Sequence, residues 1–266
     1  MEKLIIIPTY NEKENVAPLL KAVFGLQQNF HVLVIDDGSP DGTADIVKNL
    51  FAEYPGKLFL EERVDKLGLG TAYILGFRWA LKKGYQFIFE MDCDFSHNPA
   101  DLDKLYRVCK TGGADLAVGS RYVKGGKVEN WPAIRNGISK GASIYTRLLT
   151  FMPVKDPTAG FICYRHYVLE AINLEKISFV GYAFQIEMKF AAWKLGFRIE
   201  EVPITFVDRK YGVSKMNKGI VKEGIFGVLK LKWMSMFKNY RSRVKNYDLP
   251  FQNQPLAPLE QNHTST

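Results

Sequence analysis

Short β-rich runs alternate with helix-length amphipathic segments through the first half of the chain, and this alternation constrains the fold more than any other feature. The strand-sized runs span residues 4–8, 31–36, 57–60, 85–91 and 115–120. Apolar residues at helical spacing predict helices that begin near Glu12 and at residues 41–43, and helices over 69–83 and 100–109. Such a βαβα order is typical of an α/β fold with a mostly parallel sheet covered on both faces.

The second half is less regular. Its spacing predicts helices over residues 131–150, 184–195 and 220–237, and a strand over 199–207. Apolar and lysine residues mix in 220–237, which fits a membrane-facing helix slightly better than a last helix packed on the core. Residues 248–266 are rich in Pro, Gln and Asn without periodicity, which is typical of a disordered tail. We therefore predict a main domain over 1–215, an amphipathic helical segment over 216–245 and a tail over 246–266.

The chain has 266 residues and a net charge of +8, which favours anionic partners. Nucleic acid, phosphorylated metabolites and an anionic membrane face all satisfy that charge, so charge alone does not choose among them. The apolar runs are far shorter than the roughly 20 residues that a membrane-spanning helix needs, and the N-terminus lacks a secretory pattern. We expect a soluble, cytoplasmic chain whose three cysteines, Cys93, Cys109 and Cys163, are reduced structural thiols.

Polar clusters follow four of the predicted strands, at residues 8–12, 36–39, 92–94 and 119–122. Ligands of open parallel sheets bind outside the carboxyl ends of the strands. The clusters therefore bring an aromatic ring, several carboxylates and an arginine to one edge of the sheet. Tyr10 suits stacking on a base as well as packing at a strand end. Asp36 and Asp37 suit a base or ribose contact as well as turn chemistry.

Asp92 and Asp94 are the sharpest of these features. Side chains at positions i and i+2 of an extended segment point to the same side, so both carboxylates can face one ion. Hard oxygen ligands suit Mg²⁺ or Mn²⁺, with phosphate oxygens and water completing the coordination. An Asp-x-Asp pair alone is a weak motif that also fits two solvated turn residues. Its place after a buried strand favours a metal site that handles a nucleotide diphosphate.

Other enzyme classes fit less well. The chain has no Walker loop, and Tyr73 occupies the place of the third glycine in a dinucleotide fingerprint beginning at Gly68. Residues 137–141 match the nucleophile elbow of the α/β-hydrolases, but that elbow must join a strand to a helix and this one lies inside a predicted helix. His97 fits a hydrogen-bonded turn better than a metal ligand, and Glu187 fits a helix face better than a catalytic base.

In combination, these motifs are recognisable. Residues 8–12 (PTYNE), 36–39 (DDGS), 92–97 (DCDFSH) and 119–122 (GSRY) resemble those of the inverting family 2 glycosyltransferases. A narrower resemblance, to the dolichyl-phosphate (polyprenyl-phosphate) mannose synthases, rests on residues 125–126, 131–132, 135, 139–141, 156–161, 209 and 212–215. It runs in order from about residue 3 to residue 235.

The resemblance implies a Rossmann-like nucleotide-diphosphosugar transferase (GT-A type) fold, with a catalytic domain over residues 1–215. The positions that match donor-binding residues are Pro8, Tyr10, Glu12, Ile35, Asp37, Asp92, Cys93, Asp94, Arg209, Ser214 and Lys215. The metal ligands match Asp92 and Asp94, with Ser96 where some relatives have glutamine. The acceptor-phosphate residues match Arg121, Arg135 and Ser139. The catalytic residues implied are Asp94, Arg121 and Arg135, and Val213 stands where the family's mobile loop commonly has glutamate.

The resemblance also implies a reaction: metal-dependent, inverting transfer of mannose from GDP-mannose to a polyprenyl (dolichyl) phosphate, with Mg²⁺ or Mn²⁺ and a β-linked product. A phosphate monoester is already an anionic nucleophile at neutral pH, so no side-chain base is required. The implied partners are the sugar nucleotide, the lipid acceptor and a membrane surface, which the chain would meet as a peripheral protein on the cytoplasmic face.

Three alternative functions remain beside this implied reaction. UDP-glucose or another sugar nucleotide would keep the chemistry and change the donor. A nucleotidyltransferase of similar fold needs a glycine-rich, basic N-terminal loop, which is missing here. A nucleic-acid-binding protein would explain the basic charge, but the carboxylate cluster would repel its phosphates, so we expect no nucleic-acid partner.

Overall fold

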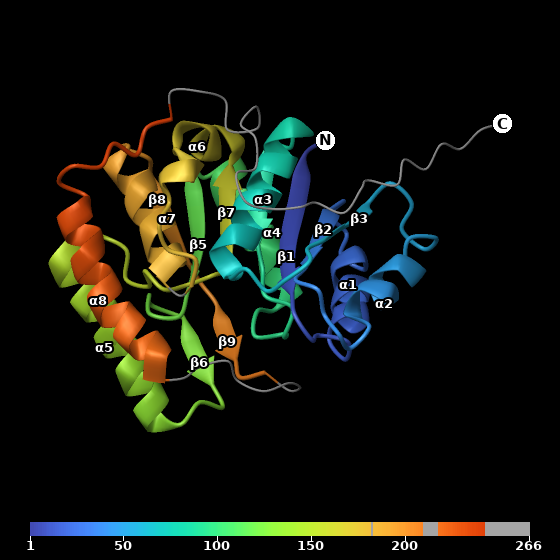
Figure 1. The fold of residues 1–266 in the computed structure, drawn as a ribbon, viewed down its shortest axis with the longest axis horizontal. Helices are drawn as coiled ribbons and strands as arrows, with labels where there is room; N and C mark the ends of the chain where they lie inside the picture. The colour runs from blue at the N-terminus through green and yellow to red at the C-terminus, as the bar shows by residue number, and fades with distance from the viewer. Residues whose placement is uncertain (182, 210–217, 243–266) are drawn as a thin grey trace.

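The structure is a computed structural model that describes residues 1–181, 183–209 and 218–242, without the side chains of residues 218–225. A seven-stranded sheet in the order β3-β2-β1-β4-β7-β5-β8 forms its centre, and a two-stranded sheet pairs β6 with β9 (Figure 1). The strands of the large sheet are β1 (Lys3–Thr9), β2 (His31–Asp36), β3 (Leu58–Glu62), β4 (Phe87–Glu90), β5 (Leu116–Ser120), β7 (Ile162–Arg165) and β8 (Ile199–Pro203). The small sheet consists of β6 (Lys127–Glu129) and β9 (Thr205–Val207).

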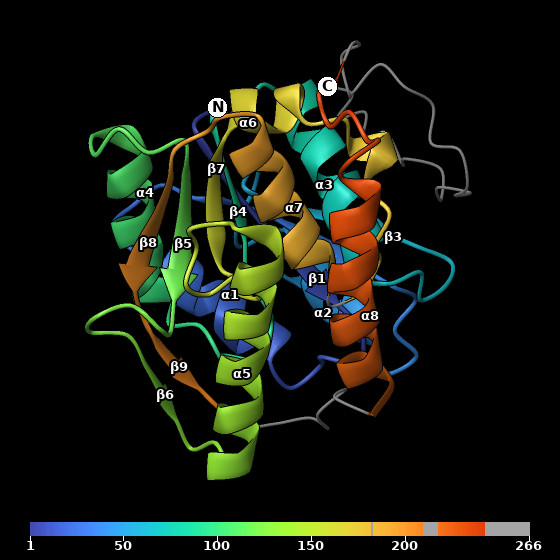
Figure 2. The ribbon, with the colours of Figure 1, turned by 90° about the vertical axis from the view of Figure 1, so that its left-hand side faces the viewer.

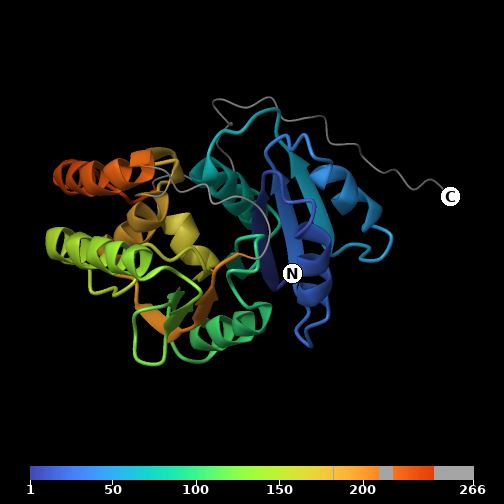
Figure 3. The ribbon, with the colours of Figure 1, turned by 90° about the horizontal axis from the view of Figure 1, so that it is seen from below.

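Helices flank the large sheet. They are α1 (Val16–Phe24), α2 (Thr43–Asn49), α3 (Leu69–Lys82), α4 (Leu102–Lys110), α5 (Ala133–Thr150), α6 (His166–Ala171), α7 (Ala183–Lys194) and α8 (Lys218–Met234), with short 3-10 helices at Pro99–Asp101 and Leu174–Lys176. Figure 3 shows α1 and α2 beside β1 to β3 at one end of the molecule, and α5 and α8 side by side at the other.

Alternate residues of the central strand β1 enter two separate cores. Leu4 and Ile6 pack in one core with residues of α3 and α7, whereas Ile5 and Ile7 pack in the other with residues of α1 and α4. Because both faces of the strand are buried, its sequence is a continuous apolar run rather than an alternation.

The strand order of the large sheet indicates where a ligand crevice lies. β1 pairs in parallel with β2 on one side and with β4 on the other. The direction of winding therefore reverses between β1 and β4, and sheets of this kind bind ligands outside the carboxyl ends of the strands at such a point. The predicted polar clusters at residues 8–12 and 92–94 lie at these two strand ends.

The predicted elements of the first half are confirmed, with shifted ends. The largest shift is at α1, which begins at Val16 rather than near Glu12. Residues 12–15 form a turn instead, in which the N–H groups of Asn15 and Val16 both donate to the Glu12 carbonyl.

The second half contains elements that the sequence did not predict. β7 lies between β4 and β5 and runs antiparallel to both, and β6 and α6 are also new. The single strand predicted over 199–207 was wrong, because the chain changes sheets at Ile204. The N–H of Ile204 donates to the carbonyl of Ser120, the last residue of β5, and the Ile204 carbonyl accepts from the N–H of Lys127 of β6.

The predicted C-terminal helix is present as α8 and ends at Met234 rather than at residue 237. Val228 and Leu231 are buried, so the packing of this helix on the core is confirmed for its inner face, while Phe226, Leu229 and Trp233 are exposed.

No helix in the described ranges is both long and apolar enough to cross a membrane. The three cysteines are buried and free, as predicted. Residues 243–266, which include the predicted tail, lie outside the described residues.

Candidate active site

A cavity of about 1020 Å³ lies at the carboxyl ends of β1, β4 and β5 and extends along α5. Every predicted site residue in the described ranges lines it, except Ile35 and Ser96. The predicted residues in the lining are Pro8, Tyr10, Glu12, Asp37, Asp92, Cys93, Asp94, Arg121, Arg135, Ser139 and Arg209. Ile35 is fully buried in the core, and Ser214 and Lys215 lie outside the described residues.

Asp36 organises the loops at one end of the cavity. Its Oδ2 accepts from Thr9 Oγ1 at 2.8 Å and from Ser39 Oγ at 2.6 Å, and its Oδ1 accepts from the Ser39 N–H at 2.8 Å. Ser39 Oγ in turn accepts from the N–H of Asn11 at 2.9 Å. Asn11 has a φ of 56°, a conformation that asparagine tolerates better than most residues. Asp36 therefore acts as a turn residue, and its hydrogen bonds connect the loop after β1 to the loop after β2.

Asp37 faces the cavity and is held from behind by Arg63. Arg63 Nε donates to Asp37 Oδ1 at 2.7 Å, and Nη2 donates to the same oxygen. Burial raises the pKa of Asp37, and the hydrogen bonds and charge of Arg63 oppose that rise. The carboxylate is thus a fixed acceptor in the cavity wall, suited to the N–H or O–H groups of a base or ribose.

Tyr10 borders the same end of the cavity with a cation on its ring. Lys66 Nζ lies 4.4 Å from the centroid of the Tyr10 ring, and both residues line the cavity. The pair combines an aromatic surface for stacking with a positive charge for a phosphate.

Asp92 and Asp94 follow β4 and crowd two carboxylates into the cavity wall. Burial raises the pKa of Asp92 to about 7, and the neighbouring charge of Asp94 adds to the effect. Asp94 Oδ1 accepts from the Ser96 N–H at 3.0 Å, and Arg209 Nη2 lies 3.2 Å from Asp94 Oδ2. Two carboxylates in such surroundings favour any cation that neutralises them.

These two residues fit the predicted divalent metal ion. Their oxygens are hard ligands, and the raised pKa of Asp92 reflects its burial and the neighbouring charge of Asp94, which a bound cation would offset. The described part of the chain holds no cluster of three His, Cys, Asp or Glu side chains suited to an ion. Two carboxylates would then leave coordination positions for phosphate oxygens and water. Ser96 is buried with its N–H on Asp94, and its role as a third ligand stays a prediction.

Two buried titratable residues of opposite charge type lie near this wall and influence each other electrostatically. Glu90 at the end of β4 and Lys189 on α7 are both fully buried. Burial raises the pKa of Glu90 to about 7 and lowers that of Lys189 to about 8, while each charge opposes the shift of the other. Gln185 donates to Glu90, and Lys189 Nζ donates to the Ala159 carbonyl at 2.6 Å. α7 thereby ties the end of β4 to the loop before β7.

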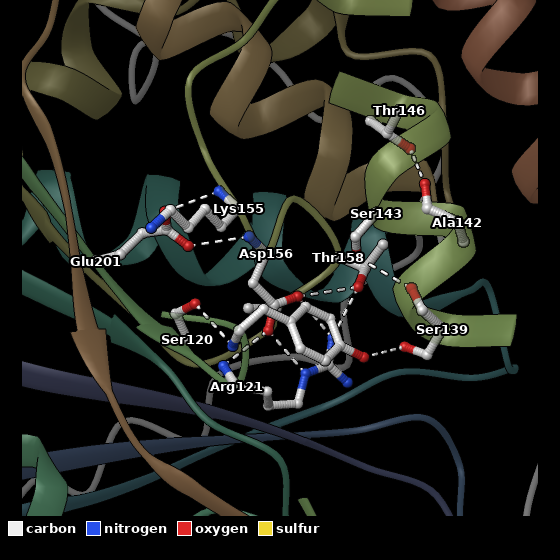
Figure 4. A network of polar contacts seen from close by, with 12 residues as sticks. Ser120, Arg121, Ser139, Ala142, Ser143, Thr146, Lys155, Asp156, Thr158 and Glu201 are labelled. Atoms are coloured by element: carbon white, nitrogen blue, oxygen red, sulfur yellow. Dashed lines mark hydrogen bonds and ion pairs between the residues drawn. The ribbon is translucent and has the colours of Figure 1, made fainter. Parts of the chain in front are cut away.

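Arg121 follows β5 at the other end of the cavity and forms a buried ion pair with Asp156 (Figure 4). Asp156 Oδ2 accepts from the Arg121 N–H at 3.0 Å and from its Nε at 2.7 Å, and Oδ1 accepts from its Nη2 at 2.7 Å. Nη2 also donates to Thr158 Oγ1 at 2.8 Å. Burial alone would raise the pKa of Asp156, but the contacts with Arg121 hold it below its usual value.

Glu201 on β8 anchors the loop that carries Asp156. Its carboxylate accepts from the N–H of Lys155 at 2.7 Å and from the N–H of Asp156 at 2.9 Å (Figure 4). The guanidinium of Arg121 is therefore fixed by a chain of contacts that begins on an edge strand of the large sheet.

Arg135 and Ser139 lie on α5, one turn apart. Arg135 Nη1 donates to both carboxylate oxygens of Asp208 at 3.0 Å, and its guanidinium carbon lies 4.0 Å from the centroid of the Trp131 ring. Ser139 Oγ accepts from the Tyr122 hydroxyl at 2.7 Å. Because α5 runs without a break through Ser139, residues 137–141 are not a nucleophile elbow, and the hydrolase alternative is excluded.

Glu187 lies on a helix as predicted, whereas His97 lacks the predicted hydrogen-bonded role, because its buried Nδ1 has no hydrogen-bond partner among the described residues. His97 stacks on Phe161 with ring centroids 4.8 Å apart, and burial lowers its pKa to about 4, so its ring is neutral at pH 7. Glu187 is fully buried, and its carboxylate accepts from the Ser178 N–H at 2.7 Å and from Lys238 Nζ at 2.6 Å.

Sequence reasoning missed several residues of the site. Lys66 and Phe206 line the cavity, and Arg63, Asp208 and Asp156 contact side chains that line it. Asp208 carried one signal, since it stands beside Arg209 at the end of a predicted strand. Arg63 and Lys66 lie in a connection between strand and helix without a motif, so only the fold reveals them.

The family model for glycosyl transferase family 2 matches residues 4–172, which is more than half of the chain. The chain belongs to glycosyltransferase family 2. It is therefore an enzyme, a glycosyltransferase.

Comparison with curated relatives indicates which members of the family this chain resembles. The glycosyltransferase is 46% identical over 225 residues to a polyprenol monophosphomannose synthase of Mycolicibacterium smegmatis, covering 85% of this chain and 84% of the relative. It is 45% identical over 244 residues to an undecaprenyl-phosphate mannosyltransferase of Micrococcus luteus, covering 92% and 99%. A dolichol-phosphate mannosyltransferase of Pyrococcus furiosus is 39% identical over 238 residues, covering 88% of this chain and 64% of the relative. The predicted resemblance to polyprenyl-phosphate mannose synthases is confirmed.

Solved structures share the fold. A glucosyl-3-phosphoglycerate synthase of Mycobacterium tuberculosis, in complex with Mn²⁺, UDP and glucosyl-3-phosphoglycerate, has a TM-score of 0.62 at 14% identity, covering 87% of this chain and 79% of that chain. A mannosyltransferase of Pyrobaculum calidifontis, in complex with GDP-Man and Mn²⁺, has a TM-score of 0.56 at 15% identity, covering 90% and 65%. The predicted nucleotide-diphosphosugar transferase fold of GT-A type is confirmed.

Proposed function

We propose that the enzyme transfers mannose from GDP-mannose to the phosphate of a polyprenyl phosphate, with a divalent metal ion and with inversion at the anomeric carbon. The observation that carries the proposal is one cavity lined both by the carboxylates that follow β4 and by arginines after β5 and on α5. The names of the relatives at 45% and 46% identity support mannose as the sugar and a lipid phosphate as the acceptor.

The carboxylate end suits a sugar nucleotide. Asp37 would accept hydrogen bonds from the base or ribose, and Tyr10 would stack on the base. Asp92 and Asp94 would hold Mg²⁺ or Mn²⁺ beside the diphosphate, with Arg209 close enough to contact the same phosphates. The bound ion would supply Lewis-acid stabilisation of the diphosphate leaving group.

The arginine end suits the acceptor. A phosphate monoester carries about −1.5 to −2 charge at neutral pH, so the nucleophile needs activation by position rather than by a base. Arg121 and Arg135 would orient it through charge-assisted hydrogen bonds, and the Ser139 hydroxyl would bind a further phosphate oxygen. Attack from the side opposite the diphosphate would invert the anomeric carbon and give a β-linked product.

We further propose that the enzyme meets its lipid at a membrane surface through the outer faces of α5 and α8, which lie side by side (Figure 2). Large apolar side chains are exposed there and just after α8, namely Ile138, Ile144, Leu148, Phe226, Leu229, Trp233, Met236 and Phe237. Lys232 Nζ lies 4.8 Å from the centroid of the Phe151 ring, as a cation at a headgroup boundary would. The cytoplasmic face stays a prediction.

Vesicle binding tests the membrane surface. Replacing both Trp233 and Phe237 with serine should weaken co-sedimentation with anionic phospholipid vesicles roughly tenfold, because two apolar side chains leave the bilayer boundary. Phe51→Ser, which alters an exposed ring just after α2, a helix at the other end of the molecule from α5 and α8 (Figure 3), should bind as the unaltered protein does. Equal binding by all three proteins would contradict this surface.

Transfer assays with two donors test the reaction. Purified protein is incubated with Mn²⁺ or Mg²⁺, a short polyprenyl phosphate, and labelled GDP-mannose or UDP-glucose in parallel. We expect label in the lipid phase from GDP-mannose alone, and none without metal. Transfer from UDP-glucose would keep the mechanism and replace the donor. Metal-dependent nucleotide binding without transfer from either donor would contradict the acceptor.

A further inference from the structure

Each arginine of the acceptor end has a carboxylate partner, and the two pairs differ in burial. The side chains of Arg121 and Asp156 are 7% and 0% exposed. Those of Arg135 and Asp208 are 24% and 29% exposed. Both arginines line the cavity, but the first pair is almost fully shielded from solvent, whereas both members of the second pair are partly exposed.

The two pairs also differ in geometry. Arg121 presents its Nε and Nη2 edge to both oxygens of Asp156, and its backbone N–H adds a third bond to the same carboxylate. Arg135 reaches Asp208 through Nη1 alone. Its Nε is buried and has no hydrogen-bond partner among the described residues. Arg135 therefore keeps donor capacity that Asp208 does not use.

These differences set how easily each pair opens. Opening the buried pair would strand an uncompensated charge away from water, which is strongly unfavourable. A half-exposed pair held by one nitrogen contributes little and exchanges readily with another anion. A phosphate that enters the cavity can thus replace the carboxylate on Arg135, but not the one on Arg121.

We propose that Asp208 is an internal counter-ion that occupies Arg135 until the acceptor phosphate replaces it, whereas Asp156 is a fixed counter-ion that positions Arg121. The inference rests on the proposed function, because it requires an anionic acceptor at these arginines. Asp208 lowers the affinity of the enzyme for its acceptor, and Asp156 raises it.

The position of Asp208 links this exchange to the other end of the cavity. Asp208 and Arg209 are neighbours at the end of β9, and the Arg209 N–H donates to Asp208 Oδ1 at 3.1 Å. Arg209 pairs with Asp94, 3.2 Å away. One strand end therefore contacts an acceptor arginine and a predicted metal ligand at once, so a change at either contact alters the other.

Titration calorimetry with geranyl phosphate, without donor or metal, tests the proposal through binding alone. Asp208→Asn should bind the probe roughly twofold to fivefold more tightly than the unaltered enzyme, since a competing half-exposed anion is gone. Asp156→Asn should bind it about tenfold more weakly, since Arg121 loses its buried partner. Glu129→Gln is the matched control. Its carboxylate lies on the neighbouring strand β6 and pairs with Lys127 rather than Arg135, so we expect unchanged binding.

GDP binding with Mn²⁺ reports whether each variant keeps its fold, and we expect all three to bind GDP within about threefold of the unaltered enzyme. If Asp156→Asn loses GDP as well, Thr158→Val takes its place. Thr158 contacts Arg121 through Nη2 only, so it should weaken geranyl phosphate binding about threefold and leave GDP binding intact.

Two outcomes separate the inference from the proposed function. Geranyl phosphate that binds the unaltered enzyme but binds Asp208→Asn equally or more weakly overturns the inference and leaves the function standing. An unaltered enzyme that neither binds geranyl phosphate nor transfers mannose to it overturns both.

Discussion

The two ends of the cavity differ in how their charged side chains are balanced. After β4, two carboxylates crowd together, and the pKa of Asp92 rises to about 7 because the group is buried and the charge of Asp94 is near. After β5 and on α5, each arginine already has a carboxylate partner within the protein. At the first end Arg209 contacts Asp94, but the raised pKa of Asp92 leaves a carboxylate that a cation would stabilise, whereas an anion at the second end must replace a partner. The comparison teaches that a proposed cation site and a proposed anion site can differ in how far the protein has already balanced their charges.

The largest effect should come from the carboxylate end. Asp94→Asn keeps the shape of the side chain but removes the charge that a metal ion requires, so we expect mannosyl transfer to fall by about 100-fold or more. Steady-state kinetics with GDP-mannose and a short polyprenyl phosphate measures the loss. Asp103→Asn, which alters an ion pair on the surface of α4, is the control and should keep its activity. Transfer by Asp94→Asn within a few-fold of the unaltered rate would contradict a metal role for this residue.

Metal affinity should depend on pH at the same end. The ion binds the deprotonated carboxylates, and the metal-free pKa of Asp92 is raised to about 7. Below that pH a proton must leave when the ion binds, so the affinity for Mn²⁺ should fall by up to about tenfold per pH unit, and it should level off above pH 7. Calorimetric titration of Mn²⁺ between about pH 5.5 and 8.5 measures this. A constant affinity across this range would show that Asp92 does not titrate with the ion.

A smaller effect should connect the two ends. Since Arg209 contacts Asp94 and its neighbour Asp208 contacts Arg135, GDP with Mn²⁺ should tighten geranyl phosphate binding by roughly threefold. In Asp208→Asn this enhancement should disappear, because Arg135 is already released. Equal enhancement in both proteins would mean that the ends communicate by another route.

The sequence predicted the carboxylate end better than the arginine end, and the reason is physical. Tyr10, Asp37, Asp92 and Asp94 each follow a regular parallel strand, so the alternation of strands and helices is enough to bring them to one edge. For Asp36 the sequence did not decide between a ligand contact and a turn role. Its hydrogen bonds with Thr9 and Ser39 show that it has the turn role.

The arginine end depends on contacts that local patterns do not encode. β7 is a short buried strand inserted antiparallel between β4 and β5, and it carries the preceding loop, with Asp156, against Arg121. The break at Ile204 moves the chain from one sheet to the other and delivers Asp208 to Arg135. Both arrangements depend on long-range strand pairing, so the sequence predicted the two arginines but not their carboxylate partners.

The most direct test of the account titrates the two ligands separately into two variants. GDP with Mn²⁺ and, in another experiment, geranyl phosphate are titrated into Asp94→Asn and Arg135→Gln. We predict that Asp94→Asn loses metal-dependent GDP binding and keeps geranyl phosphate binding, and that Arg135→Gln shows the reverse. Loss of both ligands in either folded variant, or loss of GDP alone in Arg135→Gln, would contradict a cavity with a donor end and an acceptor end.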